Sequence, residues 1–130
     1  MNKLCALLAA ALAAGALVGC AGSGASSEDG ENRIYHEVSA ADKEAAESDA
    51  PVKGNSAVLW VNGLGCPQCA SNIDLQLKRI KSVETVHTDL SNGKVHVTFK
   101  EGRAQRPSPR ALGDAAEDAG FTLVKIEAEY

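Results

Sequence analysis

The chain has 130 residues, of which 45% are hydrophobic and 23% are charged, and its formal net charge is −4. A negatively charged chain without a basic stripe or interleaved aromatic residues excludes nucleic acid as the expected partner. Its four cysteines stand out as candidate metal ligands, redox groups or modification sites.

Residues 1–19 predict a secretory signal. Lys3 precedes an alanine-rich apolar run over residues 4–18, which is short for a membrane-spanning helix and typical of a signal. The alternative is an uncleaved membrane anchor. The sequence LVGC at residues 17–20 resembles the lipobox of bacterial lipoproteins. This resemblance implies cleavage before Cys20, acyl chains on that residue and a location on the exported side of the cell membrane, at the outer membrane facing the periplasm if the cell has one.

Residues 20–56 predict an acidic flexible linker that begins with the lipidated Cys20. They carry eight acidic and three basic side chains and few large apolar ones. Such a segment cannot bury enough surface to offset the entropy of ordering it. Alanine, lysine and glutamate favour a transient helix within residues 39–50. A flexible chain of this length spans roughly 35 Å and would hold the following domain off a membrane.

The domain predicted for residues 57–130 begins with a strand and a helix. Residues 57–62 are short, apolar and β-branched, which is typical of a strand, and Gly63 ends them. Residues 68–80 predict a helix, because their apolar side chains recur at spacings of three and four and form one stripe. The members of that stripe are Cys69, Ile73, Leu77 and Ile80.

A β-hairpin is predicted next. Two stretches of alternating apolar and polar residues flank Asn92-Gly93, a strong signal for a hairpin turn. With this pair as a two-residue turn, Asp89 faces His96 across the hairpin. His87, Asp89 and His96 then share the polar face of the sheet. We expect a solvated surface there, and a second, weak metal site is the alternative.

A second helix and a last strand complete the domain. Ser108 is expected to cap a helix that starts at Pro109 and stops at Gly120. The order β-α-β-β-α-β with right-handed crossovers predicts an α+β fold of the ferredoxin-like type. Two helices then cover one face of a four-stranded antiparallel sheet, and the other face meets water. The predicted elements are residues 57–62, 68–80, 83–90, 94–99, 109–119 and 122–129.

The open face of the sheet is expected to carry the single tryptophan. Leu59 and Val61 are predicted to point into the core, which places Val58 and Trp60 on the other face. An exposed tryptophan beside a valine marks a contact surface. We expect either a partner or apolar residues of the linker to cover it, namely Ile34, Tyr35 and Val38.

The motif with the clearest chemistry is Cys66-x-x-Cys69, at the junction of the first strand and helix. Free amides and the dipole at a helix N-terminus stabilise thiolates, which are the metal-binding form of cysteine. Two soft sulfur ligands without a nearby histidine or carboxylate suit Cu(I) or Hg(II), whereas structural Zn(II) sites take four ligands. The same spacing also occurs in thiol–disulfide redox proteins, or closes a structural disulfide.

In this β-α-β-β-α-β setting the residues resemble the heavy-metal-associated domain over residues 59–126. That family includes copper chaperones, the N-terminal modules of metal-pumping ATPases and the periplasmic mercury-binding protein. The matching positions are Gly63, Leu64, Cys66, Cys69, Ile73, Leu77, Val83, Val86, Asp89, Leu90, Gly93, Val95, Val97 and the DAGF sequence at 118–121.

The resemblance implies that Cys66 and Cys69 bind the metal and that three further residues lie near it. Leu64 stands where the family usually has a buried methionine and keeps its apolar role. Gly65 stands where the family often has threonine, aspartate or histidine, which leaves the tuning of the first thiolate open. Phe121 is expected either to shield the sulfurs from water or to belong to the core.

The sequence therefore predicts an exported, lipid-anchored protein that is not an enzyme. It would hold one soft metal ion for sequestration or transfer, with Cu(I) preferred and Hg(II) or Zn(II) as alternatives. Expected partners are the membrane, through the lipid anchor, and a metal-transporting ATPase or other metal carrier. The alternatives are a thiol–disulfide redox or sensor protein that uses the same cysteine pair, and a degenerate domain that only binds a protein partner.

Overall fold

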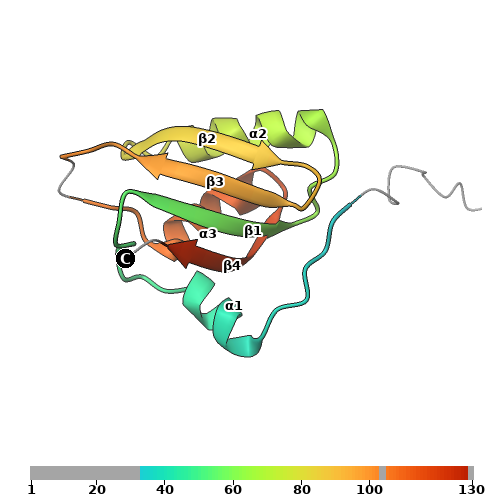
Figure 1. Cartoon of the computed structure of the whole chain (residues 1–130), viewed down its shortest axis with the longest axis horizontal. Helices are drawn as coiled ribbons and strands as arrows, with labels where there is room; N and C mark the ends of the chain where they lie inside the picture. Colours follow the sequence, from blue (N-terminus) through green and yellow to red (C-terminus); the bar gives the residue numbers. More distant parts are fainter. Residues whose placement is uncertain (1–32, 103–104, 129–130) are drawn as a thin grey trace, which may run out of the picture.

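The computed structural model describes residues 33–102 and 105–128, where the chain forms a four-stranded antiparallel sheet with helices on one face (Figure 1). The predicted signal, Cys20 and the first part of the predicted linker lie outside these residues. Across the sheet the strands follow the order β2-β3-β1-β4. The elements are α1 (Ala40–Ala46), β1 (Ser56–Asn62), α2 (Pro67–Lys78), β2 (Val83–Asp89), β3 (Lys94–Phe99), α3 (Pro109–Asp118) and β4 (Thr122–Ala128).

The ferredoxin-like fold predicted from the sequence is confirmed. Helices α2 and α3 pack together and cover the face of the sheet into which the apolar side chains of every strand point. The predicted strands and helices agree with the observed ones to within one or two residues at their ends. The largest fully buried side chains are Leu59, Val61, Leu64, Ile73, Leu77, Val95, Val97, Phe99 and Leu112. Val86 of β2 is half-buried and packs against this core.

Strand β1 shows why the alternation of the sequence fixes which side chains face the core. Leu59 and Val61 are fully buried, as predicted, and Val58 and Trp60 are half-buried on the opposite face. Successive side chains of a strand point to opposite faces, so one buried pair determines the orientation of the other. Trp60 therefore lies on the face away from α2 and α3.

Local signals set the start of both covering helices. Pro67 and Pro109 are the first residues of α2 and α3, where the missing N–H of proline has no cost. The Ser108 hydroxyl accepts a hydrogen bond from the Ala111 N–H at 3.2 Å, as expected of an N-cap. Gly120 follows α3 with φ of 88°, a conformation that favours glycine at a helix end.

The predicted register of the hairpin is wrong. Four residues, 90–93, connect β2 to β3 instead of two, so that Asp89 faces Lys94 and His87 faces His96. The Asp89 carboxylate accepts hydrogen bonds from the Ser91 N–H at 2.9 Å, from the Ser91 hydroxyl at 2.6 Å and from an Asn92 side-chain N–H at 2.7 Å. These bonds within the turn stabilise the longer connection.

The prediction of a flexible linker is wrong for its described part, residues 33–55. Residues 33–38, which we call the strap, run in extended form beside the end of β1, and α1 follows them (Figure 1). Ala46 and Val52 are 4% and 5% exposed, and Val52 belongs to the hydrophobic core. The Val52 N–H donates to the Pro107 carbonyl oxygen at 2.9 Å. Average composition favoured disorder, but a few well-spaced apolar residues bury enough surface to fix the segment.

Helix α1 lies against β4, at one edge of the sheet (Figure 1). Its N-cap Ser39 and Asp42 form a capping box, and an Asp42 carboxylate oxygen lies 3.6 Å from Lys125 Nζ in β4. The transient helix predicted within residues 39–50 is thus a docked one. Within the described part of the chain, no helix has the length and apolar character needed to cross a membrane.

The sequence predicted that the open face of the sheet meets water. In the structure this face is partly covered. The imidazole of His36 lies over Trp60, with 5.0 Å between ring centroids. The backbone N–H of His36 donates to Asn62 Oδ1 at 2.7 Å. Lys94 Nζ and Lys125 Nζ lie 4.1 and 4.9 Å from the Trp60 ring centroid. The segment expected to cover the tryptophan does so through His36, while Tyr35 remains 67% exposed.

Candidate metal centre

The cysteine loop, residues 63–66, connects β1 to α2 and positions Cys66. Gly63 adopts φ of 95°, which allows the chain to turn away from the sheet. Leu64 is fully buried below the loop and anchors it to the core. Cys66 is the N-cap of α2, and Cys69 lies in the first turn of that helix, partly packed against the core. Both cysteines are therefore held by a helix start, not by a free loop.

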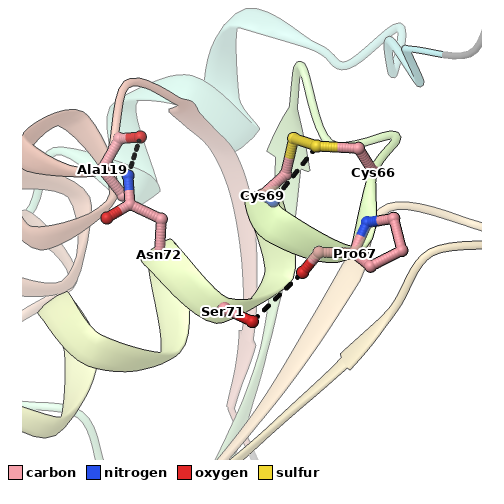
Figure 2. The surroundings of a disulfide bond; sticks show 6 residues. All are labelled: Cys66, Pro67, Cys69, Ser71, Asn72 and Ala119. Carbon is pink, nitrogen blue, oxygen red and sulfur yellow. Dashed lines mark hydrogen bonds between the residues drawn. A yellow bond between two sulfur atoms is a disulfide. The ribbon is translucent and has the colours of Figure 1, made fainter.

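The two sulfur atoms lie at the N-terminus of α2 and are bonded to each other in this structure (Figure 2). The Cα atoms of Cys66 and Cys69 are 5.1 Å apart. The Cys69 backbone N–H donates a hydrogen bond to Cys66 Sγ at 3.1 Å, using one of the amides that have no partner within the helix. After reduction, the same amides and the helix dipole favour the thiolate form.

The other residues named from the sequence surround the loop without adding a donor. A Cβ atom on Gly63 would lie 3.4 Å from Phe121 Cδ1, so the Phe121 ring lies beside the cysteine loop. Gly65 and Phe121 are half-buried, and Leu64 lies below the loop. Residues 33–102 and 105–128 contain no group of three histidine, cysteine, aspartate or glutamate side chains that could hold a metal ion. The donor set is two sulfurs, which fits a soft ion of low coordination number.

The strap also contacts the cysteine loop, which the sequence did not predict. The Ile34 N–H donates to the Leu64 carbonyl oxygen and the Gly63 N–H donates to the Ile34 carbonyl oxygen, each at 2.9 Å. Half-buried and exposed residues alternate along residues 34–38, as in a strand packed on one side. The same alternation of Ile, His and Val with Tyr and Glu in the sequence could have indicated a docked, extended segment.

Asn72 is a second residue with a role that the sequence did not reveal. Its side-chain N–H donates to the Ala119 carbonyl oxygen at 2.8 Å (Figure 2). This bond ties the middle of α2 to the end of α3, next to the turn that carries Phe121. No sequence signal separates this asparagine from an ordinary exposed one.

The fold agrees with a comparison to known protein families. The model of the heavy-metal-associated domain matches residues 58–122 of the 130. The chain belongs to the heavy-metal-associated family. The matched residues include both cysteines of the motif. They also include α2, β2, β3 and α3 completely and most of β1.

Relatives with known names include small copper chaperones and parts of copper pumps. The copper chaperone CopZ of Bacillus subtilis is 33% identical over 67 residues, which are 52% of this chain and 93% of that protein. Copper-transporting ATPase 1 of Rattus norvegicus is 29% identical over 73 residues, which are 56% of this chain and only 5% of the ATPase. The heavy-metal-associated domain here is thus similar to a whole chaperone and to one small part of a pump.

Solved structures of the same kind are also similar to this chain. A CopZ metallochaperone is 29% identical, with a TM-score of 0.47, over 53% of this chain and 98% of the other. Oxidised MerP from Ralstonia metallidurans CH34 is 21% identical, with a TM-score of 0.45, over 58% of this chain and 96% of the other.

The strap and α1 lie outside the family match, which begins at residue 58. The strap contacts the matched residues at the cysteine loop and at Trp60, and α1 lies along β4, most of which follows the match. The strap therefore lies beside the cysteine loop, which belongs to the matched residues.

Proposed function

We propose that this chain binds one soft metal ion, Cu(I) in preference to Hg(II), between the reduced sulfurs of Cys66 and Cys69. The observation that carries the proposal is the placement of these two sulfurs at the start of α2, with no third donor group among the described residues. Cu(I) and Hg(II) accept two sulfur ligands, whereas structural Zn(II) sites take four. The names of the relatives, copper chaperones and a copper-transporting ATPase, support copper as the cargo.

The same site is suited to sequestration or transfer of the ion. Both cysteines are partly exposed, so the thiolates of a partner can add to the ion before the first pair releases it. A metal-transporting ATPase or another metal carrier is the partner that this exchange would need. The cysteine pair acts as a carrier site, and the ion is its cargo.

The test is a Cu(I) competition experiment under reducing conditions with the wild-type chain, Cys66→Ser, Cys69→Ser and the double variant. Each single substitution removes one of two ligands, and a serine hydroxyl does not ionise near neutral pH. We expect each single variant to lose tight binding altogether, with one ion bound per wild-type chain. Circular dichroism serves as the folding control. Wild-type affinity in the double variant would place the copper site elsewhere.

The disulfide in the structure favours a second candidate function, thiol–disulfide exchange. In that case the Cys66–Cys69 dithiol would give two electrons and two protons to a substrate disulfide and become a disulfide itself. Turnover of a disulfide substrate with a thiol reductant separates the candidates. Turnover that persists in a metal-free chain supports exchange, and stoichiometric copper binding without turnover supports the carrier.

We also propose that the chain is anchored by lipid on Cys20 on the exported side of the cell membrane. The lipobox-like residues 17–20 support this. Ile34, near the start of the described chain, forms backbone hydrogen bonds with Gly63 and Leu64 of the cysteine loop. The described chain therefore starts beside that loop. Fully extended, the 13 residues 20–32 reach at most about 45 Å, compared with about 130 Å for all 37 residues of the predicted linker. The anchor would therefore keep the metal end of the domain close to the membrane.

A further inference from the structure

Two histidines face each other on the sheet surface away from α2 and α3. His87 of β2 and His96 of β3 are direct partners across the antiparallel ladder. Their ring centroids lie 6.4 Å apart and the ring planes are tilted by 42°. Both side chains are exposed. The sequence had placed Asp89 opposite His96, so this pairing of two imidazoles comes only from the observed register.

The backbone of β2 and β3 at these two histidines is fixed by the residue pairs that precede and follow them in the ladder. The neighbouring partners along the ladder are Val86 with Val97 and Thr88 with Val95. Val95 and Val97 are 0% and 1% exposed, and they anchor β3 in the core. Residues directly opposite in an antiparallel pair have Cβ atoms about 4.5–5.5 Å apart. The two imidazoles therefore start from fixed, adjacent points, and only their side-chain torsions can change the distance between the ring nitrogens.

That spacing fits one metal ion shared by the two rings. A metal bound by imidazole lies about 2.0–2.1 Å from the ligating nitrogen. Two rings whose centroids are 6.4 Å apart leave room for an ion between their facing edges, and small rotations bring one nitrogen of each ring to it. Asp89 lies on the same face, but its carboxylate is already bonded within the turn to Ser91 and Asn92. Asp89 thus adds negative charge nearby and is not a third ligand.

We propose that His87 and His96 form a second metal site, which takes a borderline divalent cation through two imidazole nitrogens, with water completing the coordination. Imidazole suits Cu(II), Ni(II) and Zn(II), and the general order of stability makes Cu(II) the tightest of them. The site differs in ligand type from the cysteine pair, which selects soft ions. It does not depend on the state of Cys66 and Cys69, so the chain binds two chemically different ions.

The test uses the full chain without a polyhistidine tag, carrying Cys5→Ser, Cys20→Ser, Cys66→Ser and Cys69→Ser so that added Cu²⁺ finds no thiol to oxidise or bind. Calorimetric titration with Cu²⁺ alone is expected to give one ion per chain. His87→Ala and His96→Ala should each weaken binding at least tenfold, because each leaves a single imidazole. The matched control is Thr85→Ala with Thr98→Ala, the exposed neighbouring pair on the same face, which should bind Cu²⁺ as the parent does.

A second measurement needs no histidine substitution. Titration of the same parent chain with Zn²⁺, followed by NMR of the imidazole resonances, should shift His87 and His96 together and leave His36 unchanged. The proposal is overturned if the double histidine variant binds Cu²⁺ as tightly as the parent. It is also overturned if Zn²⁺ shifts only one of the two rings, or if the threonine control loses binding to the same extent as the histidine variants.

Discussion

At the scale of single residues, Gly93 is the point at which the strap meets the hairpin. It is buried and has φ of 66°, in the left-handed region that favours glycine. A Cβ atom at this position would lie 2.9 Å from His36 Nε2 and 3.0 Å from Ile34 Cγ2. Gly93 is therefore needed for two separate reasons, the turn itself and the close approach of the strap.

Replacement of Gly93 by alanine should destabilise the chain more than the same change at Gly102. Both residues have positive φ, which costs an alanine about 1–2 kcal/mol. A Cβ at Gly102 meets nothing within 4 Å, whereas at Gly93 it collides with the strap, and crowding of this kind adds about 1–3 kcal/mol. The free energies of unfolding are measured by urea denaturation. Equal losses in the two variants would mean that the strap is not held against Gly93.

At the scale of secondary-structure elements, the strap and α1 cover parts of the sheet that α2 and α3 leave exposed. Helix α1 lies along β4, a strand with a free edge that is otherwise available for unwanted pairing. The strap covers Trp60 on the open face and hydrogen-bonds to the cysteine loop. The two added elements thus shield one edge and part of one face of the sheet, and they restrain the loop that precedes Cys66.

Removal of the strap should expose Trp60 to water. A chain that starts at residue 39 keeps the Ser39 cap of α1. It lacks the His36 ring, which lies over Trp60 in the full chain. We expect tryptophan emission to move to longer wavelength because the indole gains contact with water. The substitution His36→Ala in the full chain is the matched variant and should shift emission in the same direction. Unchanged emission in both would show that the strap does not cover Trp60 in solution.

The N-terminal cap of α1, and to a smaller extent its contact with Lys125 of β4, should weaken in acid through Asp42. Hydrogen bonds from the Ser39 hydroxyl and N–H, with a smaller contribution from the Lys125 charge, hold the pKa of the Asp42 carboxyl below its ordinary value of 3.8. A carboxyl with a lowered pKa stabilises the fold fully above its unfolded-state pKa. This contribution is lost as the pH falls through the lower pKa of the folded state.

The measurement is the free energy of unfolding as a function of pH in wild type and Asp42→Asn. The difference between them should be present above about pH 4 and shrink at lower pH. Asp89, whose pKa is also lowered, by Ser91, is present in both chains and cancels. A difference that grows on acidification would contradict the assignment.

At the scale of the whole molecule, the cysteine loop of the proposed metal site and the point where the described chain begins lie at the same end. Ile34 is hydrogen-bonded to the cysteine loop, and Gly93 of the hairpin turn lies against the strap. A lipid on Cys20 would therefore tether the domain by its metal end. Such a tether would favour exchange with a partner in the same membrane over exchange with a freely diffusing one.

The anchor prediction is tested on the protein purified from membranes. Mass spectrometry should find Cys20 as the first residue, carrying acyl chains, with residues 1–19 absent. The substitution Cys20→Ser should release the chain from the membrane without changing its copper affinity, because the cysteine pair is untouched. An unmodified Met1, or a wild-type chain found free of the membrane, would refute the lipid anchor.

The sequence by itself determined the fold of residues 57–128 and the position of the cysteine pair. Hydrophobic period sets which face of a strand or helix is buried, so Leu59, Val61 and the stripe of α2 could be placed without a structure. Proline, serine and glycine at helix ends are local signals of the same kind. These features depend on neighbours within a few residues, and the sequence shows such neighbours directly.

Only the tertiary structure decided the features that depend on distant contacts. The strap docks because Ile34 and His36 meet Gly63, Trp60 and Gly93, partners far away in the sequence. Composition alone averages over such partners and predicted a flexible linker. The register of the hairpin was also decided only by the structure, which pairs His87 with His96. A shift of register changes every cross-strand pair at once. The sequence placed both histidines on one face of the sheet, but only the folded chain shows that they are direct partners.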